Sequence, residues 1–482
     1  MPLVEKELDS ECYIGDERLI NLIDEAVVSL CKELRDEGKQ CFLVGGATRD
    51  LLMGQKPKDW DLTTDATPEE MMKIFKNERV VPSGIKHGTI TVIKDNEPYE
   101  ITTFRTEGRY SDGRRPDYVA FTPSLEEDLK RRDLTINAIA YDPIGHKIVT
   151  TPNDGIDDLR NRVIKAVGDP GERFREDGLR PMRVCRFASR LNFDVSDATL
   201  KAIEENVDVI DNISSERIRD ELIGILKSDK PSVGLECLRS TGLLKKVLPE
   251  LDDLYGLEQT PQYHKYDVYW HTLHGLDSIP KENLAARVAF LFHDTGKKPA
   301  RAWSERKQRY AFSGHEELSA TLTEEIMTRL KFSKAEIDKA KAIVANHMMH
   351  DTSEWSDKAV RKLVNRVGEE NVEDLLIMHE GDLRGKGRDI TKELDNLKNL
   401  RERLKRLKEE TGKAGFTSRD LAITGYDVME YLDLSPSPEV GKVINHLTEK
   451  VMEDPSLNTK ESLYALMNQM KCRKDTHVFL NV

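Results

Sequence analysis

Cysteines, aromatic residues and long apolar runs are scarce in this sequence, and each scarcity argues against a class of protein. The six cysteines lack the paired spacing of a zinc site or a disulfide framework, so we expect reduced thiols. No stretch approaches the ~20 apolar residues of a membrane span, and the acidic segment 1–19 lacks the apolar core of a signal peptide. The sequence therefore predicts a cytoplasmic, unprocessed protein that does not enter a membrane.

Positive charge is also in deficit. The net charge of −13 disfavours indiscriminate binding to nucleic acid, because an acidic protein repels phosphate unless its basic residues gather in one place. Aromatic residues make up 6% of the chain and charged residues 33%, which is typical of a helix-rich soluble protein rather than a β-sandwich or barrel. At 482 residues the chain is long enough for several domains.

Strand and helix patterns alternate in the first 150 residues. Strands are expected at 40–44 and around 60–62, a hairpin at 88–104, and helices at 18–34, at 50–53 and from Pro68. Thr67 is the expected cap of that last helix. After Pro143 the strand pattern fades. We interpret residues 1–150 as a mixed α/β domain.

The rest of the chain has helical patterns, which makes the predicted fold class α+β. Loop-like composition at 257–266 predicts a domain boundary there. We expect four parts, namely a head (1–150), a neck and body (151–255), a helical domain that contains most of the histidines (256–390) and a helical tail (391–482).

Asp59 and Asp61 are the first candidates for chemistry. On a strand, side chains two residues apart point to the same face, so both carboxylates can face one site. Such a pair can hold the two Mg²⁺ ions of phosphoryl transfer. The alternative is a solvated Asp-x-Asp in a loop.

A glycine pair precedes these aspartates. Gly45 and Gly46, followed by Arg49, would let the backbone approach a triphosphate closely, although an ordinary turn is the alternative. The whole run from Leu43 to Met71 resembles the signature motif of class II tRNA nucleotidyltransferases and bacterial poly(A) polymerases. The resemblance implies a polymerase-beta-like head with Mg²⁺ at Asp59 and Asp61, and nucleotide contacts from Gly45, Gly46 and Arg49.

Further segments resemble that family in the same order. The segment 131–142 looks like its second motif, which implies nucleotide contacts from Arg132, Asp133 and Asn137. The segment 155–170 is similar to the motif that links head and neck. The segment 176–180 resembles the motif whose aspartate and arginine act as a protein template, here Asp177 and Arg180.

The template role has a physical rationale. Asp177 offers acceptors and Arg180 a donor fork, so together they can imitate the pairing edge of a base. The alternative is a surface salt bridge between them. Pro181 predicts that a helix begins or kinks there. Downstream, Arg183, Arg186 and Arg190 form a basic stripe at helical spacing, which would face triphosphate or RNA, although a solvated face is equally open for Arg190.

Three features of residues 84–117 refine this prediction. Glu100, on the predicted hairpin, is a candidate third acidic residue near the metals. The basic segment 105–117 resembles the flexible loop of enzymes that add all of CCA, although an exposed disordered loop is the alternative. The segment 84–92 looks more like the tRNA enzymes than the poly(A) polymerases.

A second candidate metal site lies downstream. The order of His271, the doublet His293-Asp294 and Asp382 resembles the HD superfamily of phosphohydrolases, and His315 and His347 are candidate extra ligands. Imidazoles and carboxylates on a helical bundle can hold one or two divalent metals and activate water. The resemblance implies a second metal (Mg, Mn, Ni or Fe) and a phosphatase or phosphodiesterase activity, or a retained fold without activity. His264, His274, His350 and His379 are interpreted as structural.

Taken together, the resemblance implies a CCA-adding tRNA nucleotidyltransferase that uses CTP and ATP, as a monomer or homodimer. The alternatives are an A-adding enzyme or poly(A) polymerase, a phosphohydrolase whose head only binds nucleotide, and a non-catalytic RNA-binding protein. The charge-dense run 386–413 and the segments after it either contact RNA or form a solvated helix with ion pairs; we favour the ion pairs.

Overall fold

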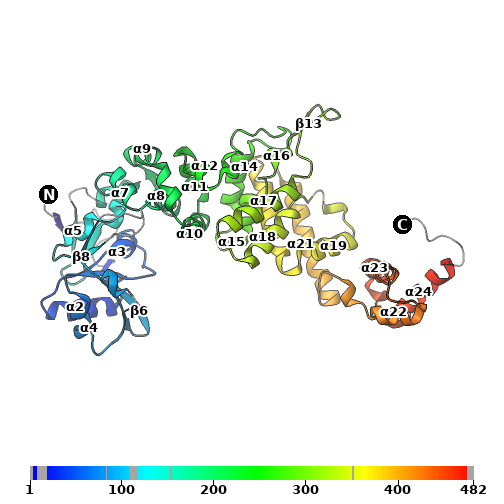
Figure 1. Cartoon of the computed structure of the whole chain (residues 1–482), viewed down its shortest axis with the longest axis horizontal. Coiled ribbons are helices and arrows are strands. Elements are labelled where there is room, and N and C mark those ends of the chain that lie inside the picture. The colour runs from blue at the N-terminus through cyan, green and yellow to red at the C-terminus, as the bar shows by residue number, and fades with distance from the viewer. Residues whose placement is uncertain are drawn as a thin grey trace. The chain divides into compact units, whose positions relative to one another are not determined.

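The computed structural model describes residues 4–7, 19–82, 84–108, 118–151, 155–349 and 352–474. The chain divides into two compact units, which we name unit 1 (Met1–Pro249) and unit 2 (Glu250–Val482) (Figure 1). No helix in the described ranges is long and apolar enough to cross a bilayer. The predicted α+β class, a mixed α/β head followed by helical segments, is confirmed.

Unit 1 begins with an eight-stranded sheet of order β1-β10-β9-β2-β3-β6-β5-β4. Its strands are β1 (Val4–Glu7), β2 (Cys41–Leu43), β3 (Asp61–Thr64), β4 (Arg79–Val81), β5 (Thr89–Lys94), β6 (Glu97–Thr103), β9 (Ile139–Asp142) and β10 (Lys147–Thr150). β3 and β6 run parallel, whereas the other paired strands of this sheet run antiparallel. The parallel pair matters for the site, because it sets the start of β3 beside the middle of β6.

Several predicted elements of unit 1 are confirmed. The hairpin of β5 and β6 turns at Asp95 and Asn96, both at positive φ (53° and 66°), as a tight hairpin requires. Helix α4 (Pro68–Ile74) is capped by Thr67, whose hydroxyl accepts from the backbone of Glu70 while the Glu70 carboxylate accepts from Thr67. Four described cysteines are buried free thiols, in agreement with the predicted reduced state.

Other boundaries differ from the prediction. Helix α3 (Gly45–Leu52) begins at the glycine pair rather than near Asp50, and β3 begins at Asp61, so Asp59 precedes the strand. Helix α2 begins at Glu25, after the extended residue Asp24, rather than at Arg18. β10 continues the sheet beyond Pro143, where the strand pattern faded.

Helices surround the sheet and then form the rest of unit 1. They are α2 (Glu25–Asp36), α5 (Leu125–Lys130), α6 (Gly155–Arg160), α7 (Pro170–Glu176), α8 (Arg180–Leu191), α9 (Asp197–Glu205), α10 (Ser215–Leu226), α11 (Pro231–Ser240) and α12 (Leu243–Val247). Two small sheets pair β7 (Arg105–Glu107) with β8 (Val119–Phe121) and β11 (Val163–Ile164) with β12 (Asp194–Val195). α8 packs against α10 and α11. Pro181 lies in the first turn of α8, as predicted.

In its described residues, unit 2 has helices and one hairpin. α13 (Pro249–Asp252) lies at its start, and its further helices are α14 (Val268–Ser278), α15 (Leu284–Phe292), α16 (Lys297–Ala300), α17 (His315–Arg329), α18 (Lys334–Ala345), α19 (Asp357–Val367), α20 (Val372–Gly385), α21 (Thr391–Thr411), α22 (Gly425–Leu432), α23 (Pro438–Glu453) and α24 (Lys460–Lys474). The pairs α14–α20, α15–α20 and α17–α18 pack together. The hairpin of β13 (Ala302–Ser304) and β14 (Arg309–Ala311) was not predicted, because each strand has only three residues.

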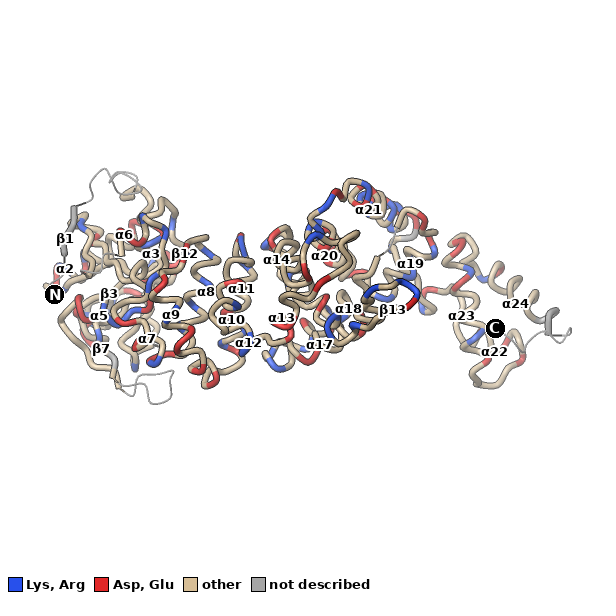
Figure 2. The backbone as a smooth tube through the Cα atoms, turned by 90° about the horizontal axis from the view of Figure 1, so that it is seen from above, with Lys and Arg blue, Asp and Glu red and all other residues tan. Residues whose placement is uncertain are grey.

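The charge-dense run forms α21, along which Figure 2 shows basic and acidic residues intermixed. Several of its cations pair with carboxylates of other segments. Arg401 lies 3.1 Å from Glu380, and Arg403 and Arg406 lie within 3.0 Å of Asp357. These contacts support the favoured interpretation of a helix with ion pairs.

Candidate active site and a second cluster of ligands

Three carboxylates, those of Asp59, Asp61 and Glu100, lie near one another where β3 begins. The register of the parallel pair sets Asp61 opposite Glu100, and Asp59 lies in the bend that leads into β3. Burial raises the pKa of Asp61, Arg132 opposes that rise, and Glu100 and Asp59 add to it. Glu100 and Asp59 therefore disfavour the charge on Asp61, and a bound cation would relieve this repulsion.

Gly45 lies against this group. Its φ of +69° belongs to the left-handed region, and a Cβ there would lie 3.3 Å from Oδ2 of Asp61 and 3.4 Å from Nη1 of Arg132. The N-terminus of α3 thus approaches the Asp61 carboxylate closely because residue 45 has no side chain. Gly45 thus belongs to a helix start rather than to an ordinary turn, and the predicted approach of this backbone to a triphosphate stays a prediction.

We expect Gly45→Ala to lower the predicted nucleotide-transfer activity by about tenfold, because the methyl group would displace Asp61 or Arg132 by a few tenths of an ångström. Gly38→Ala is the matched control. Gly38 has a similar φ of +75°, and an added Cβ would have no atom within 4 Å, so this variant carries the backbone strain without the obstruction. Steady-state incorporation of radiolabelled nucleotide measures both variants, and an equal loss in both would contradict the steric explanation.

Arg49, predicted to contact nucleotide, is buried and held by protein groups. Its Nη1 donates to Oδ1 of Asn137 at 2.7 Å, and its Nε and Nη2 donate to Oδ1 of Asp50 at 2.9 and 2.6 Å. Burial lowers the pKa of Arg49, and Asp50 opposes this effect. In this structure Arg49 and Asn137 therefore connect α3 to the short 3-10 helix η2 (Thr135–Asn137).

Asp133 and Arg183 form an ion pair between the second motif and α8. Nε and Nη2 of Arg183 lie 2.7 and 2.6 Å from Oδ2 of Asp133, and the backbone N–H of Leu134 donates to Oδ1 at 2.9 Å. Burial alone would raise the pKa of Asp133, but Arg183 lowers it well below its usual value. The pair orients two predicted nucleotide-binding residues toward each other.

We expect Arg183→Met to lower the free energy of unfolding of unit 1 by about 1–3 kcal/mol at neutral pH, because the partly buried Asp133 carboxylate would lose its charged partner. Arg190→Met is the matched control, since the Arg190 side chain is 47% exposed and lies 3.7 Å from Asp50. Its effect should stay within about 1 kcal/mol. Hydrogen–deuterium exchange of amides in α8 measures the stability of this unit alone.

The same pair predicts a pH dependence. Because the folded pKa of Asp133 is depressed, the ion pair's contribution is fully present above the unfolded pKa of about 4 and is lost as the pH falls through the folded value. Without Arg183, burial raises the pKa of Asp133, so the destabilisation of Arg183→Met should shrink as the pH falls toward that unfolded value. A deficit that stays constant with pH would contradict this explanation.

Asp177 and Arg180 lie where α7 passes into α8. Asp177 is extended, and its carboxylate accepts from Nη2 of Arg217 at 2.9 Å and from the backbone of Leu179 at 3.0 Å. Nη1 of Arg180 lies 2.5 Å from Oε2 of Glu176. The two side chains thus pair with different partners rather than in the salt bridge that was the alternative interpretation.

Two arginines of the α8 stripe and one arginine of α3 lie around one aromatic ring. The guanidinium carbons of Arg49, Arg183 and Arg186 lie 5.2, 5.6 and 4.5 Å from the centre of the Phe187 ring. Nε of Arg186 also lies 2.6 Å from Oε2 of Glu221. Arg183 and Arg186 therefore each have a carboxylate partner, and their contacts position α8 against the head and α10.

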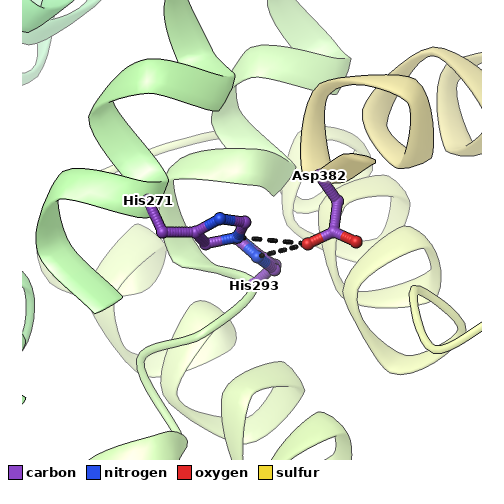
Figure 3. A group of neighbouring side chains, drawn as sticks. All are labelled: His271, His293 and Asp382. Atoms are coloured by element: carbon purple, nitrogen blue, oxygen red, sulfur yellow. Dashed lines mark ion pairs between the residues drawn. The ribbon is translucent and has the colours of Figure 1, made fainter. Parts of the chain in front are cut away.

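A second group of ligands lies in unit 2. His271 of α14, His293 at the end of α15 and Asp382 of α20 converge, with Nε2 of His271 3.1 Å and Nε2 of His293 3.8 Å from Oδ1 of Asp382 (Figure 3). Burial would raise the pKa of Asp382, but Lys386, His271 and His293 lower it well below its usual value. Three ligand atoms of this group lie within 4.8 Å of one another.

Asp294 joins this group to a second one. Its Oδ2 lies 3.2 Å from Nε2 of His293, while its Oδ1 lies 3.5 Å from Nε2 of His315 and 3.9 Å from Nε2 of His347. Asp294, His315 and His347 are themselves within 4.8 Å of one another. The two carboxylate oxygens of Asp294 therefore face two sets of histidines.

The backbone fixes how these histidines point. Nδ1 of His293, His315 and His347 lies 2.6, 2.8 and 2.7 Å from the carbonyl oxygens of Phe290, Phe312 and Val344. A proton on Nδ1 leaves the Nε2 lone pair free, which is how metal-binding histidines are oriented. Nε2 of His271 and His293 and Oδ1 of Asp294 are buried and, although they lie near the other cluster groups, form no well-aligned hydrogen bond. This donor set fits divalent metal ions.

Family models match three parts of the chain. The poly A polymerase head domain matches residues 41–165, and a probable RNA and SrmB-binding site of polymerase A matches residues 192–255. A putative tRNA nucleotidyltransferase domain 2 matches residues 310–467. The matched head contains the carboxylates of β3 and β6, Gly45 and the Asp133 segment.

Similarity to individual proteins extends over almost the whole chain. The CCA-adding enzyme of Pediococcus pentosaceus is 35% identical over 447 residues, which cover 93% of this chain and 98% of that relative. The chain belongs to the CCA-adding enzyme family. Another member of the family, from Enterococcus faecalis, is 32% identical over 92% of this chain and 95% of its own length. The crystal structure of the Bacillus stearothermophilus CCA-adding enzyme in complex with CTP matches with a TM-score of 0.70 and 28% identity, covering 94% of this chain and 98% of that one.

Membership of the CCA-adding enzyme family confirms the resemblance of the head and neck segments, whereas the resemblance of residues 256–390 to the HD superfamily stays a prediction. Sequence reasoning missed Arg217 and Glu221, the partners of Asp177 and Arg186, because they lie some 35 to 40 residues away along the chain. It also missed Lys297, whose Nζ lies 2.7 Å from Oδ2 of Asp294. Lys297 is the last residue of the run His293 to Lys297, so the sequence motif itself could have indicated a lysine beside the Asp294 carboxylate. The predicted loop residues 109–117 and His350 lie outside the described residues.

Proposed function

We propose that this chain adds C, C and A to the 3′ end of tRNA from CTP and ATP, without a nucleic-acid template. The observation that carries the proposal is the group of Asp59, Asp61 and Glu100 against Gly45, since it combines metal-binding oxygens with a close backbone approach. The family's common activity, and the CTP in the Bacillus stearothermophilus complex, support the reaction and its nucleotides.

The carboxylates of Asp59 and Asp61, with Glu100 beside them, suit Mg²⁺, which prefers oxygen ligands. The raised pKa of Asp61 supports this assignment, because burial and neighbouring carboxylates disfavour its charge until a cation compensates. When bound, Mg²⁺ would activate the attacking 3′-hydroxyl and neutralise charge on the leaving pyrophosphate.

The protein's own groups would select and position the nucleotide. The N–H groups at the start of α3 and the guanidinium of Arg132 lie beside Asp61, where a triphosphate would be held. Asp177 and Arg180 would read the base through acceptors and a donor fork. In the structure these two hold Arg217 and Glu176, so a base would have to replace those contacts. Arg183 and Arg186 are the remaining residues of the proposed nucleotide site, which takes its residues from the head and from the neck and body.

The test supplies the purified chain with tRNA that ends before CCA, after C or after CC, with CTP and ATP given separately. We expect CMP on the first two substrates and AMP only on the third. Addition of AMP alone after CC, with no use of CTP, would favour an A-adding enzyme. Repeated AMP addition to every substrate would favour a poly(A) polymerase.

We propose a second activity for unit 2, the metal-dependent hydrolysis of phosphoesters. The observation that favours it is the convergence of His271, His293 and Asp382, joined through Asp294 to His315 and His347, with buried ligand atoms that form no well-aligned hydrogen bond. A divalent metal bound there would activate water. Lys297 and Lys386, each within 2.9 Å of a cluster carboxylate, would then be positioned to contact a phosphate.

A further inference from the structure

The hairpin of β13 and β14 exposes two aromatic rings. Trp303 is 49% and Tyr310 47% exposed, and their ring centres lie 5.4 Å apart at an interplanar angle of 82°. The rings belong to residues paired across the two strands, so the backbone holds them together. Figure 1 shows β13 beyond the short helix α16. Large rings held at a surface in this way are typical of a binding site.

The same hairpin is basic. Its cations are Arg301, Arg306, Lys307 and Arg309, which together with Trp303 and Tyr310 we name the hairpin patch. Arg301 stacks on Tyr310, with its guanidinium carbon 3.8 Å from the ring centre, and Arg309 lies 5.6 Å from the ring of Tyr263. Among the described residues, none of the four cations pairs with a carboxylate. In α21, by contrast, cations such as Arg403 are neutralised by ion pairs.

The hairpin patch is connected to the histidine cluster of unit 2. The hairpin lies between Asp294 and His315 in the chain, and the carbonyl of Phe312, just after β14, lies 2.8 Å from Nδ1 of His315. On the other side, Tyr263 precedes His264, whose ring centre lies 5.0 Å from that of His271. A ligand on the patch would therefore lie next to the elements that hold the cluster.

We propose that the hairpin patch binds single-stranded RNA, with bases stacking on Trp303 and Tyr310 and phosphates facing Arg301, Arg306, Lys307 and Arg309. Exposed rings combined with unpaired cations are the two features that single-strand binding surfaces share. Paired bases in a duplex are already stacked and hidden, so they gain little from such rings. The inference rests on RNA being the substrate of the proposed function, but not on hydrolysis in unit 2.

The test measures binding of a short fluorescein-labelled single-stranded RNA to the full chain by fluorescence anisotropy. We expect Trp303→Ala/Tyr310→Ala to weaken binding by about tenfold or more. Trp303→Phe/Tyr310→Phe should keep most of the affinity, because phenylalanine retains a face for stacking. The matched control is Tyr426→Ala in α22, which removes a ring that is 81% exposed and lies outside the patch.

Equal affinity of the double alanine variant and the wild type would overturn the proposal, as would an equal loss in Tyr426→Ala. An acidic peptide that binds as tightly as the RNA, with the same loss in the double alanine variant, would instead identify the patch as a protein-binding site. Photo-cross-linking of RNA that contains 4-thiouridine adds a direct reading, and we expect cross-links within residues 301–312. Cross-links confined to unit 1 would contradict the proposal.

Failure of this inference is distinct from failure of the proposed function. Nucleotide addition, assayed at saturating tRNA on the same preparations, depends on the carboxylates of unit 1. Normal addition with unchanged RNA binding in the double alanine variant would refute the hairpin patch alone. Absence of addition by the wild type would refute the proposed function, whatever the anisotropy shows.

Discussion

Asp61→Asn is expected to lower the rate of CMP addition by about 10³-fold. The amide replaces an anionic oxygen with an N–H₂ group that repels a cation, and Asp61 is half-buried whereas Asp59 and Glu100 are exposed. Single-turnover addition at saturating CTP and tRNA measures the effect on chemistry rather than on binding.

Stability separates a catalytic role of Asp61 from a structural one. Since burial and the nearby carboxylates raise its folded pKa, the charged form costs stability, and the neutral amide should melt at the same or a higher temperature. Glu97→Gln is the matched control, because Glu97 begins the same strand as Glu100 and is exposed. Wild-type rates in Asp61→Asn, or a loss of activity that only follows a lower melting temperature, would contradict the assignment.

His293→Ala is expected to abolish metal binding and phosphoester hydrolysis by unit 2 while leaving nucleotide addition unchanged. His293 lies near both Asp294 and Asp382, so its removal takes a ligand from the centre of the cluster. Cobalt(II) absorption of the full chain would report the coordination directly, and hydrolysis of a nucleotide phosphoester would report the activity. A chelator should remove both signals from the wild type.

His274→Ala is the matched control for this prediction. His274 lies on α14 with His271, but its ring packs against Tyr266 and Trp270 rather than against the cluster. The His274→Ala variant should therefore bind cobalt and hydrolyse phosphoesters like the wild type. If His293→Ala still hydrolysed phosphoesters, the cluster would not be the hydrolytic site, and if it lost nucleotide addition, the two sites would not be independent.

The order of motifs predicted the head of the molecule well, because local patterns carried the information. Strand alternation located the hairpin of β5 and β6, and Thr67 and Pro68 located the start of α4. The proximity of Asp61 and Glu100 was harder to predict from the sequence, since it depends on the parallel register of β3 and β6. The common-face argument for Asp59 and Asp61 assumed a strand that includes both, whereas β3 begins only at Asp61.

Contacts between residues far apart in the chain could not be predicted from local sequence patterns. Arg49 is predicted to bind nucleotide, yet the structure buries its guanidinium against Asn137, 88 residues away. Arg186 pairs with Glu221 across two helices, which helical spacing alone cannot indicate. The β13–β14 hairpin has strands too short for a periodic pattern, so its aromatic and basic side chains had no recognisable context before the fold placed them.

The most direct test of the proposed function is the 3′-terminal sequence of tRNA that lacks CCA after incubation with CTP, ATP and Mg²⁺. We expect the wild-type chain to yield ends that stop at CCA, and Asp61→Asn to yield unextended ends under the same conditions. Runs of A, or CCA ends produced equally by Asp61→Asn, would contradict it.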